Sequence, residues 1–413
     1  MANDVTVLDV LLYGKPIGTF TRLAGDRTLF AFNEAYIGDK DRPTLSLGFK
    51  DDLGNLITDF NPVQTRVMPF FSNLLPEGRM RTYLAERAGV NPVREFFLLW
   101  VLGEDLAGAV TIQPADSEEW PPDAADGSEA SDQITKENVL RFSLAGVQLK
   151  FSAVEDARKG LTIPAKGVGG SWIVKLPARE FEGVPENEFS MMTLARLVGI
   201  DVPPIKLVDV SEIGNLPSGI ETLKGRALAI GRFDRLSDGT KVHIEDFAQI
   251  FGLYPDNKYG KASAMNIARV IGAESNDNDI AEFARRLTFN TLIGNADMHV
   301  KNWSVMYPDT RNAVLAPAYD FVATIAYIPD DTAALKVSRT KRFDGFSKDE
   351  LSHMAARAHL PEKLVLDTAH ETVALFHEQW QAEKKNLPLA AGVVEAIEAH
   401  MKKIPLVKPA DAA

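Results

Sequence analysis

Six residues in the last third of the chain combine four polar functional side chains with two apolar ones. The segment from Asp297 to Asn302 reads Asp-Met-His-Val-Lys-Asn. Enzymes that transfer phosphoryl groups use an Asp to accept the proton of the incoming hydroxyl, and an Asn five residues later to hold a magnesium ion on the nucleotide phosphates. Asp297 and Asn302 have this spacing. The segment therefore predicts a kinase.

Three further residues supply the charges that such chemistry requires. Asp320 follows an apolar, strand-like run that begins at Leu315, and it is a candidate second magnesium ligand, although an Asp that initiates a turn is the alternative. Lys175 lies in a β-branched run, from which a long side chain can present its ammonium to phosphates. Glu188, at the start of the next helix, could pair with Lys175 and orient it. A solvent-facing edge lysine, and a glutamate that only stabilises its helix dipole, remain the alternatives.

A segment of small residues precedes Lys175 and is the candidate for covering the phosphates. It runs from Ser143 to Lys150, and its small side chains permit close approach of the backbone to a phosphate. The Walker A pattern and the His-Glu-x-x-His pattern are both missing from the sequence, which disfavours a P-loop nucleotidase and the usual zinc protease. The candidate phosphate-loop residues are Ala145, Gly146, Val147, Gln148 and Lys150.

Composition limits the class of protein. The chain has 413 residues, of which 45% are hydrophobic and 25% charged, as in ordinary globular proteins with two or three lobes. There is no cysteine, which excludes disulfides and thiolate zinc sites and leaves oxygen-ligated magnesium as the easiest metal to bind. The formal net charge of −12 argues against broad binding to nucleic acid. With no signal-peptide pattern and no long apolar run, we expect a cytoplasmic protein without membrane contact.

The pattern of apolar and polar residues predicts an α+β chain that ends in an all-helical lobe. A strand, a Gly/Pro turn and a second strand are expected over residues 5–20, another strand over 45–49, and helix over 67–88. The segment after residue 115 turns acidic and rich in Ser, Pro and Ala, which indicates a linker. The predicted units are an α+β subdomain (1–114), the linker (115–136), a nucleotide-binding sheet lobe (137–242), a helical lobe (243–404) and a flexible tail (405–413).

Taken together, these motifs resemble the HipA-type serine/threonine kinases, the toxins of bacterial HipA/HipB toxin–antitoxin modules. The resemblance spans nearly the whole chain, because further matching motifs lie between the ones already described. They are Tyr-Gly-Lys-Pro-Ile-Gly at 13–18, Leu-Leu-Pro-Glu-Gly at 74–78, Gly-Arg-Phe-Asp-Arg at 231–235, Glu-Asp-Phe-Ala-Gln at 245–249 and Tyr-Gly at 259–260. The implied fold is the two-lobed protein-kinase-like fold.

The resemblance implies a role for each matching residue. Asp297 would be the catalytic base, Asn302 and Asp320 the magnesium ligands, and Lys175 the phosphate-contacting lysine. Ser143 falls on the serine that family members autophosphorylate, a modification associated with ejection of the phosphate loop; an ordinary strand serine is the alternative. The residues expected around ATP are the hinge Gly231, Arg232 and Phe233, together with Asp234, Gln249, His299, Lys301, Tyr319 and Glu188.

The chain departs from the family pattern at three places. Leu149 and Phe151 replace a glutamate and a threonine of the phosphate loop, and Gly231 replaces a glutamate that is common at the hinge. The first two changes affect side-chain contacts of the loop, whereas Gly231 can still contact adenine through its backbone.

The resemblance also implies partners. These are a HipB-like helix-turn-helix antitoxin, which would bring the chain to operator DNA indirectly, and a translation factor as protein substrate, with glutamyl-tRNA synthetase as the family precedent. Two alternatives stay open from the sequence. One is a noncatalytic ATP-binding scaffold that only binds the antitoxin, and the other is a kinase of a small molecule, because phosphoryl-transfer residues do not encode the acceptor.

Overall fold

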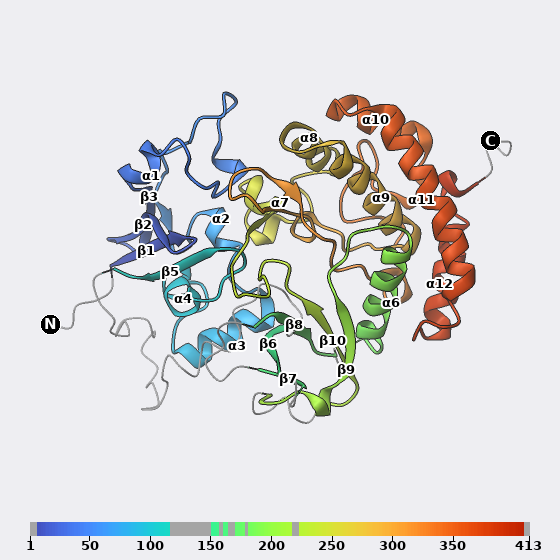
Figure 1. Cartoon of the computed structure of the whole chain (residues 1–413), viewed down its shortest axis with the longest axis horizontal. Coiled ribbons are helices and arrows are strands. Elements are labelled where there is room, and N and C mark those ends of the chain that lie inside the picture. The colour runs from blue at the N-terminus through green and yellow to red at the C-terminus, as the bar shows by residue number, and fades with distance from the viewer. Residues whose placement is uncertain are drawn as a thin grey trace.

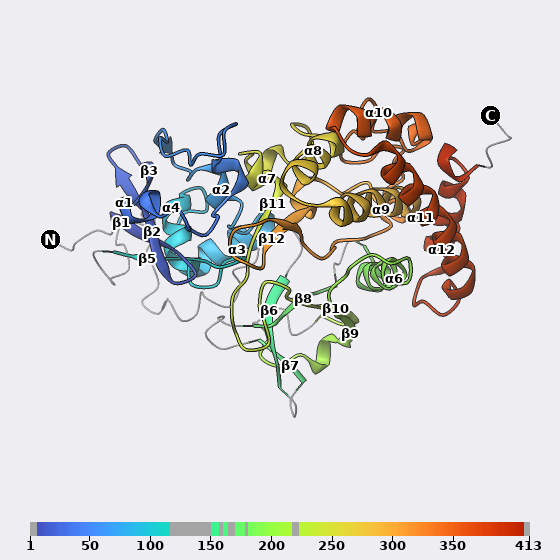
Figure 2. The same ribbon diagram turned by 45° about the horizontal axis from the view of Figure 1, so that its top comes forward.

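The computed structural model describes most of the chain (Figures 1 and 2). Within this part, no helix is both long and apolar enough to cross a membrane. The described residues are 6–115, 150–156, 160–163, 170–177, 181–216 and 223–408.

An antiparallel five-stranded sheet opens the fold, with strand order β4-β3-β2-β1-β5. Its first strand shows why it forms: Leu8, Val10 and Leu12 are buried and alternate with less buried residues, as expected for a strand with one face on a core. Short helices cover the buried face, and the segment lies at the left of Figure 1. The elements are β1 (Val7–Leu12), β2 (Lys15–Leu23), β3 (Arg27–Phe32), β4 (Val63–Gln64), β5 (Val110–Pro114), α1 (Glu34–Gly38), α2 (Pro69–Ser72), α3 (Gly78–Ala88) and α4 (Glu95–Leu102).

A second antiparallel sheet of five strands follows, with order β7-β6-β8-β10-β9. In its register, Lys150 of one strand lies opposite Lys175 of the next, so the two lysines are neighbours across the ladder. One helix accompanies the sheet and contacts two of its strands. The elements are β6 (Lys150–Asp156), β7 (Gly160–Thr162), β8 (Trp172–Lys175), β9 (Ile205–Asp209), β10 (Arg226–Gly231) and α6 (Val184–Leu197).

The rest of the chain is mostly helical, and its helices gather on the right of Figure 1. The lobe that the sequence predicts to be all-helical also contains a small antiparallel sheet with order β11-β12-β13, which holds the segment before α7 against the segment after residue 303. The elements are β11 (His243–Asp246), α7 (Phe247–Ile250), α8 (Ala264–Glu274), α9 (Asp277–Ile293), β12 (Ser304–Tyr307), β13 (Val314–Leu315), α10 (Lys348–Ala358), α11 (Glu362–Glu383) and α12 (Ala391–Met401).

Two hydrophobic cores hold the described residues together. One joins the buried faces of the two five-stranded sheets, for example Phe20 and Phe71 with Phe151 and Val174. The other fills the helical lobe and includes the buried residues of α6. Helix α6 therefore packs on the core of the helical lobe while it contacts β9 and β10 of the sheet, so it connects the two parts.

Three local predictions are wrong. Residues 47–49 form a 3₁₀ turn instead of a strand, because the N–H of Leu47 and the hydroxyl of Ser46 both donate to Glu245. The helix predicted over 67–88 is divided into α2 and α3, since Pro76 in the intervening turn has no N–H for a continuous helix. The predicted tail begins with an ordered 3₁₀ turn at Pro405–Val407, where Leu406 is buried.

Candidate active site

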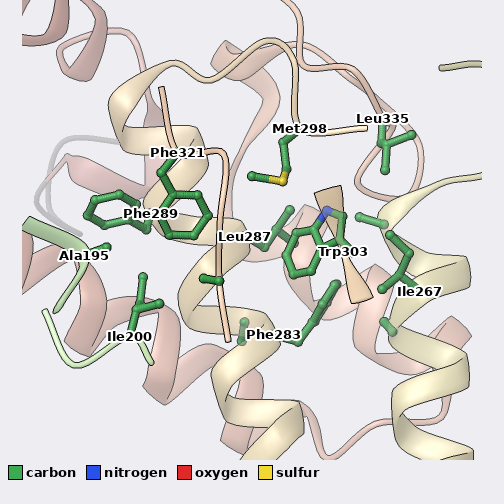
Figure 3. Close-up of a cluster of buried hydrophobic side chains, with 14 of the residues drawn as sticks. Ala195, Ile200, Ile267, Phe283, Leu287, Phe289, Met298, Trp303, Phe321 and Leu335 are labelled. Carbon is green, nitrogen blue, oxygen red and sulfur yellow. The ribbon is translucent and has the colours of Figure 1, made fainter. Parts of the chain in front are cut away.

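The segment from residue 295 to 303, here called the Asp297 loop, follows helix α9. That helix ends at Gly294, whose left-handed backbone (φ 66°) is a conformation that glycine adopts readily. The apolar residues of the loop are buried: Met298, Val300 and Trp303 lie in the core of the helical lobe. Figure 3 shows Trp303 close to Phe283, with ring centroids 5.1 Å apart. The apolar residues thus anchor the loop, while the side chain of Asp297 remains exposed.

Asp297 is held by contacts to both its backbone and its carboxylate. Its N–H donates to Oδ1 of Asn295 over 3.1 Å, and its carbonyl accepts from Nδ2 of Asn302 over 3.0 Å. The hydroxyl of Tyr259 donates to Oδ1 of Asp297 over 2.7 Å. Desolvation by the surrounding protein raises the pKa of Asp297, and the hydrogen bond from Tyr259 opposes that rise.

Asp320 lies at the centre of a buried ionic cluster. Its backbone is left-handed (φ 59°), and its carboxylate forms an ion pair with Lys175 and lies 3.8 Å from Nζ of Lys150. Nζ of Lys175 also donates to Oε1 of Glu188 over 2.5 Å, so the predicted pairing of these two residues is confirmed. Burial by itself would lower the pKa of Lys175, but the carboxylates of Asp320 and Glu188 outweigh it and raise this pKa. Burial likewise would raise the pKa of Asp320, and the two lysines instead lower it.

Asn295 connects these two halves of the site, although no prediction singled it out. Its Nδ2 donates to the backbone carbonyl of Asp320 over 3.1 Å and to Oδ1 of Asn290 over 2.9 Å, while its Oδ1 accepts from Asp297. The side chain is buried. The backbones of Asp297 and Asp320 are therefore tied to each other through one side-chain amide. The position of Asn295, two residues before Asp297, is the signal that could have identified it.

The turn between α2 and α3 brings Glu77 from the first subdomain to the Asp297 loop. Oε2 of Glu77 lies 2.9 Å from Nζ of Lys258, and Oε1 lies 3.6 Å from Nζ of Lys301. Lys301 also donates to Oδ1 of Asn73 over 2.8 Å and to Asp246 over 2.9 Å. The ammonium of Lys301, predicted to contact ATP, is thus surrounded by acceptors of the protein itself and joins two subdomains. Glu77 belongs to a motif that the sequence analysis recognised without assigning it a role.

His299 is buried beside Asp297, and its ring packs edge-on against Tyr259 with centroids 5.1 Å apart. Burial, followed by the charge of Lys258, lowers the pKa of His299 to about 3, so the imidazole is neutral at neutral pH. Its Nδ1 is buried and has no hydrogen-bond partner among the described residues. A buried polar atom without a partner is costly, and it fits a site that accepts a polar ligand group.

The predicted hinge has its first two N–H groups engaged within the protein. The N–H of Gly231 donates to Pro204 over 2.7 Å, and that of Arg232 donates to Ser171 over 2.8 Å. The ring of Phe233 stacks on that of Tyr319, with centroids 6.0 Å apart. A contact with adenine at this place would therefore involve Phe233 and Tyr319 rather than the N–H groups of Gly231 and Arg232.

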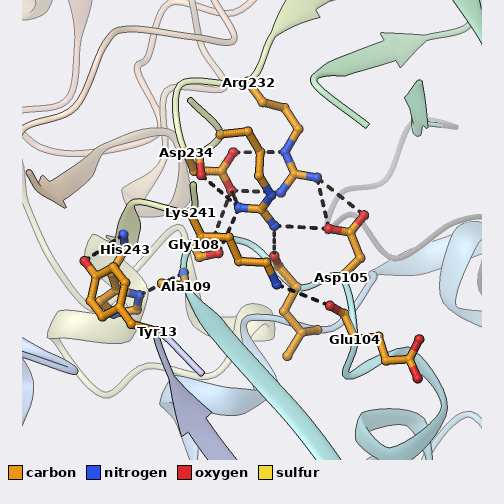
Figure 4. Close-up of polar contacts among 11 residues, drawn as sticks. Tyr13, Glu104, Asp105, Gly108, Ala109, Arg232, Asp234, Lys241 and His243 are labelled. Carbon is orange, nitrogen blue, oxygen red and sulfur yellow. Dashed lines mark hydrogen bonds and ion pairs between the residues drawn. The ribbon is translucent and has the colours of Figure 1, made fainter. Parts of the chain in front are cut away.

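Three further predicted residues direct their polar groups to other parts of the protein. The side chains of Arg232 and Asp234 belong to a buried cluster with Asp105 and Arg235. Figure 4 shows Arg232 and Asp234 beside Asp105. Gln249 accepts from the N–H of Asp246 and donates to the carbonyl of Phe70. The structure does not bring these side chains into the contacts around Asp297 and Asp320.

The remaining predicted residues lie outside the part of the chain that the structure describes. They are Ser143, the linker residues 116–136, and the phosphate-loop residues Ala145, Gly146, Val147 and Gln148.

The donor atoms at the site fit magnesium that is shared with a nucleotide. Within the described ranges, no three His, Cys, Asp or Glu side chains gather as a ready-made metal site. Asn302 and Asp320 offer a carboxamide and a carboxylate, and Mg²⁺ commonly takes one or two such protein ligands and completes its shell with water and substrate phosphates. Lys150 and Lys175 both form ion pairs with the carboxylate of Asp320, and from there their ammonium groups can also neutralise phosphate charge.

A two-lobed fold with a Lys–Glu pair, an Asp/Asn loop and a second carboxylate defines a kinase-like protein. Family models for the HipA N-terminal domain and the HipA-like C-terminal domain match residues 8–113 and 142–380. The chain therefore belongs to the HipA family.

Named relatives agree with this assignment. A Sinorhizobium fredii protein named "Putative kinase Y4dM" is 59% identical over 98% of both chains. The serine/threonine-protein kinase toxin HipA of Shewanella oneidensis is 27% identical over 65% of this chain and 66% of its own. Among solved structures, a chain of the Shewanella oneidensis HipA, HipB and operator DNA complex shares the fold, with a TM-score of 0.71 and 21% identity, covering 97% of this chain and 96% of that one.

Proposed function

We propose that the chain is an ATP- and Mg²⁺-dependent protein serine/threonine kinase. The observation that carries this proposal is the connection of Asp297 to the Lys175–Glu188–Asp320 cluster through the side chain of Asn295. The main chain that carries the base for the acceptor hydroxyl is thereby tied to the main chain that carries Asp320 of the charged cluster, and phosphoryl transfer requires such relative positioning.

Each residue then has a task. Asp297 orients the acceptor hydroxyl and takes its proton, and Glu188 holds Lys175 in place. Lys175, together with Lys150, neutralises phosphate charge, while Asn302 and Asp320 would hold Mg²⁺. The metal would supply charge stabilisation of the transferring group. The neutral imidazole of His299 offers its unpartnered Nδ1 to a polar group of the ligand.

The biological context is proposed from the family. The chain would act as the toxin of a HipA/HipB-like module, bound by a helix-turn-helix antitoxin that contacts operator DNA. The fold shared with the HipA, HipB and operator DNA complex supports this, and the net charge of −12 favours DNA contact through the antitoxin rather than by the chain itself. The proposed substrate is a translation factor, with glutamyl-tRNA synthetase the first to test, and Ser143 is the proposed site of autophosphorylation.

Incubation of the purified chain with a cell lysate and labelled ATP tests this function. A labelled protein that is absent when Asp297→Ala replaces the wild type is the expected result. Label confined to small molecules, or equal labelling by both chains, would contradict the proposal. Intact-mass measurement should show one phosphate fewer on Ser143→Ala than on the wild type, and an unchanged mass shift would place the modification elsewhere.

A further inference from the structure

Tyr259 combines an exposed position with a specific contact to the site. The residue follows the 3₁₀ turn Pro255–Asn257, and 48% of its surface is accessible. Its hydroxyl nevertheless donates to Oδ1 of Asp297 over 2.7 Å. An exposed tyrosine at the surface gains little from a hydrogen bond to one particular carboxylate, so the contact points to a role at the site.

The position of Tyr259 is fixed from several sides. Its ring packs edge-on against His299 at 5.1 Å, and the ammonium of Lys258 lies 5.5 Å from the ring centroid. Lys258 is itself held by Glu77 over 2.9 Å, and its carbonyl accepts from the N–H of Val300. The position of the phenol oxygen is therefore restrained. A series of contacts from Glu77 through Lys258 and Tyr259 connects the first subdomain with the carboxylate of Asp297.

The carboxylate of Asp297 needs such a support. The hydrogen bonds from Asn302 and to Asn295 involve only its backbone, so they fix the main chain and leave rotation of the carboxylate about its last torsion free. That torsion is broad and roughly two-fold in carboxylate side chains. The bond from Tyr259 to Oδ1 restrains this torsion, and Oδ2 does not take part in that bond.

We infer that Tyr259 is the positioning residue of the reaction, which turns Asp297 so that Oδ2 receives the acceptor hydroxyl. This inference rests on the proposed function. In this role Tyr259 acts through Asp297, and its contacts are with Asp297, His299 and Lys258 rather than with Lys150 or Lys175. Its removal should therefore lower the rate of transfer without weakening nucleotide binding.

Tyr259→Phe tests the inference, because it removes only the oxygen and keeps the ring that packs on His299. We expect kcat to fall about tenfold or more, since a hydrogen bond to a charged group is worth about that factor, with the KM for ATP unchanged. Tyr254→Phe is the matched control: it lies five residues earlier, its ring faces the guanidinium of Arg66 at 5.0 Å, and it should leave both constants unchanged.

Combination with Asp297→Asn separates positioning from a general effect on folding. If Tyr259 acts through Asp297, the residual rate of Asp297→Asn should be the same with Tyr or Phe at position 259, whereas a structural defect would lower it further.

If the wild type is active, a kcat for Tyr259→Phe equal to that of the wild type would overturn the inference. A KM for ATP that is raised in Tyr259→Phe would overturn it as well. Phosphate found on Tyr259 would also overturn it, because the phenol would then be an acceptor. An inactive wild type would instead count against the proposed function.

Discussion

At the residue scale, Lys175 joins the carboxylates of Glu188 and Asp320 in a low-dielectric site. Replacing a buried ion-pair partner by an apolar residue leaves the remaining charges uncompensated. In Lys175→Met, Glu188 loses its bonded cation, and among the described residues Asp320 retains Lys150, which lies 3.8 Å away. The site would keep its metal ligands but lose the cation that holds phosphate.

We therefore expect Lys175→Met to lower kcat/KM for ATP by about a hundredfold or more, as measured by steady-state transfer, because electrostatic groups of this kind typically contribute such factors. Lys206→Met is the control in the same sheet, since Lys206 is partly exposed and pairs with Glu155. It should retain the wild-type rate. Equal rates for Lys175→Met and the wild type would remove Lys175 from the mechanism.

Sequence reasoning selected Lys175, Glu188, Asp297 and Asp320 as candidates, and the structure brings the first two together with Asp320 in one ionic cluster. It assigned no role to residues whose importance arises only from contacts across the fold, although Tyr259 belongs to the matching Tyr-Gly motif at 259–260. Tyr259 reaches Asp297 across 38 positions of sequence, and Asn73 reaches Lys301 across 228. It also placed Arg232, Asp234 and Gln249 around ATP, whereas their side chains have partners within the protein, because a motif records residue types and not the direction in which a side chain points.

At the element scale, the end of helix α9 determines where the Asp297 loop begins. Gly294 has a left-handed backbone, and a Cβ at this position would lie 2.5 Å from Cδ1 of Ile325. The next residue is Asn295, so any displacement here moves the amide that links Asp297 to Asp320.

Gly294→Ala should therefore reduce both stability and turnover. The left-handed backbone alone costs about 1–2 kcal/mol for a residue with a Cβ, and the contact with Ile325 adds to that cost. Denaturant unfolding and transfer assays measure the two effects. Gly392→Ala, in helix α12 where a Cβ would meet no atom within 4 Å, should leave stability unchanged or slightly raised. If Gly294→Ala behaved like Gly392→Ala, the end of α9 would not be the constraint described.

The element that sequence periodicity predicted well is β1, which has one clear apolar face. The 3₁₀ turn at residues 47–49 was predicted as a strand because its own residues read as a strand. Its conformation is decided instead by Glu245, about two hundred positions later, which binds Ser46 and Leu47. No local pattern contains that information.

At the scale of the whole molecule, buried polar groups join the first subdomain to the rest. Asp105 lies between the guanidinium groups of Arg232 and Arg235, at 3.3 and 3.1 Å. Figure 4 shows Asp105 and Arg232 with Asp234 in one network. Each member is buried or nearly so. The relative position of the two subdomains therefore depends on charges that water screens poorly.

Asp105→Asn should destabilise the protein by about 3 kcal/mol, because breaking a buried ion pair leaves charge without compensation. Thermal or denaturant unfolding measures this loss. Asp344→Asn is the comparison, since the pair between Asp344 and Arg342 is half-exposed and should contribute little. A loss for Asp105→Asn no larger than that for Asp344→Asn would show that the cluster does not hold the subdomains together.

The second contact between the subdomains involves a buried carboxyl group. Glu245 accepts hydrogen bonds from Ser46, from the N–H of Leu47 and from the hydroxyl of Tyr307. Burial raises the pKa of Glu245 from its ordinary value of 4.5 to about 7, while these donors oppose the rise and the nearby charge of Asp246 adds to it. Because the folded state binds this proton more tightly, its contribution to stability is complete below pH 4.5 and is lost as the pH rises towards 7.

Glu245→Gln removes this proton-binding group while keeping its size. The stability of the variant relative to the wild type should increase by roughly 3 kcal/mol between pH 4.5 and pH 7.5, and unfolding titrations at both pH values would measure it. The lowered pKa of His243 adds its own pH dependence, but to both proteins alike. A difference in stability that did not change with pH would contradict a protonated Glu245 in the folded protein.

The most direct measurement of the central claim compares the purified wild type with Asp297→Asn for binding of Mg²⁺-ATP and for transfer of labelled phosphate to protein. Asp297 is assigned to the acceptor and not to the phosphates, so the variant should bind nucleotide as tightly as the wild type. Its transfer should be slower by about a hundredfold or more, the usual contribution of a positioned general base. Equal transfer by the two proteins would contradict the account.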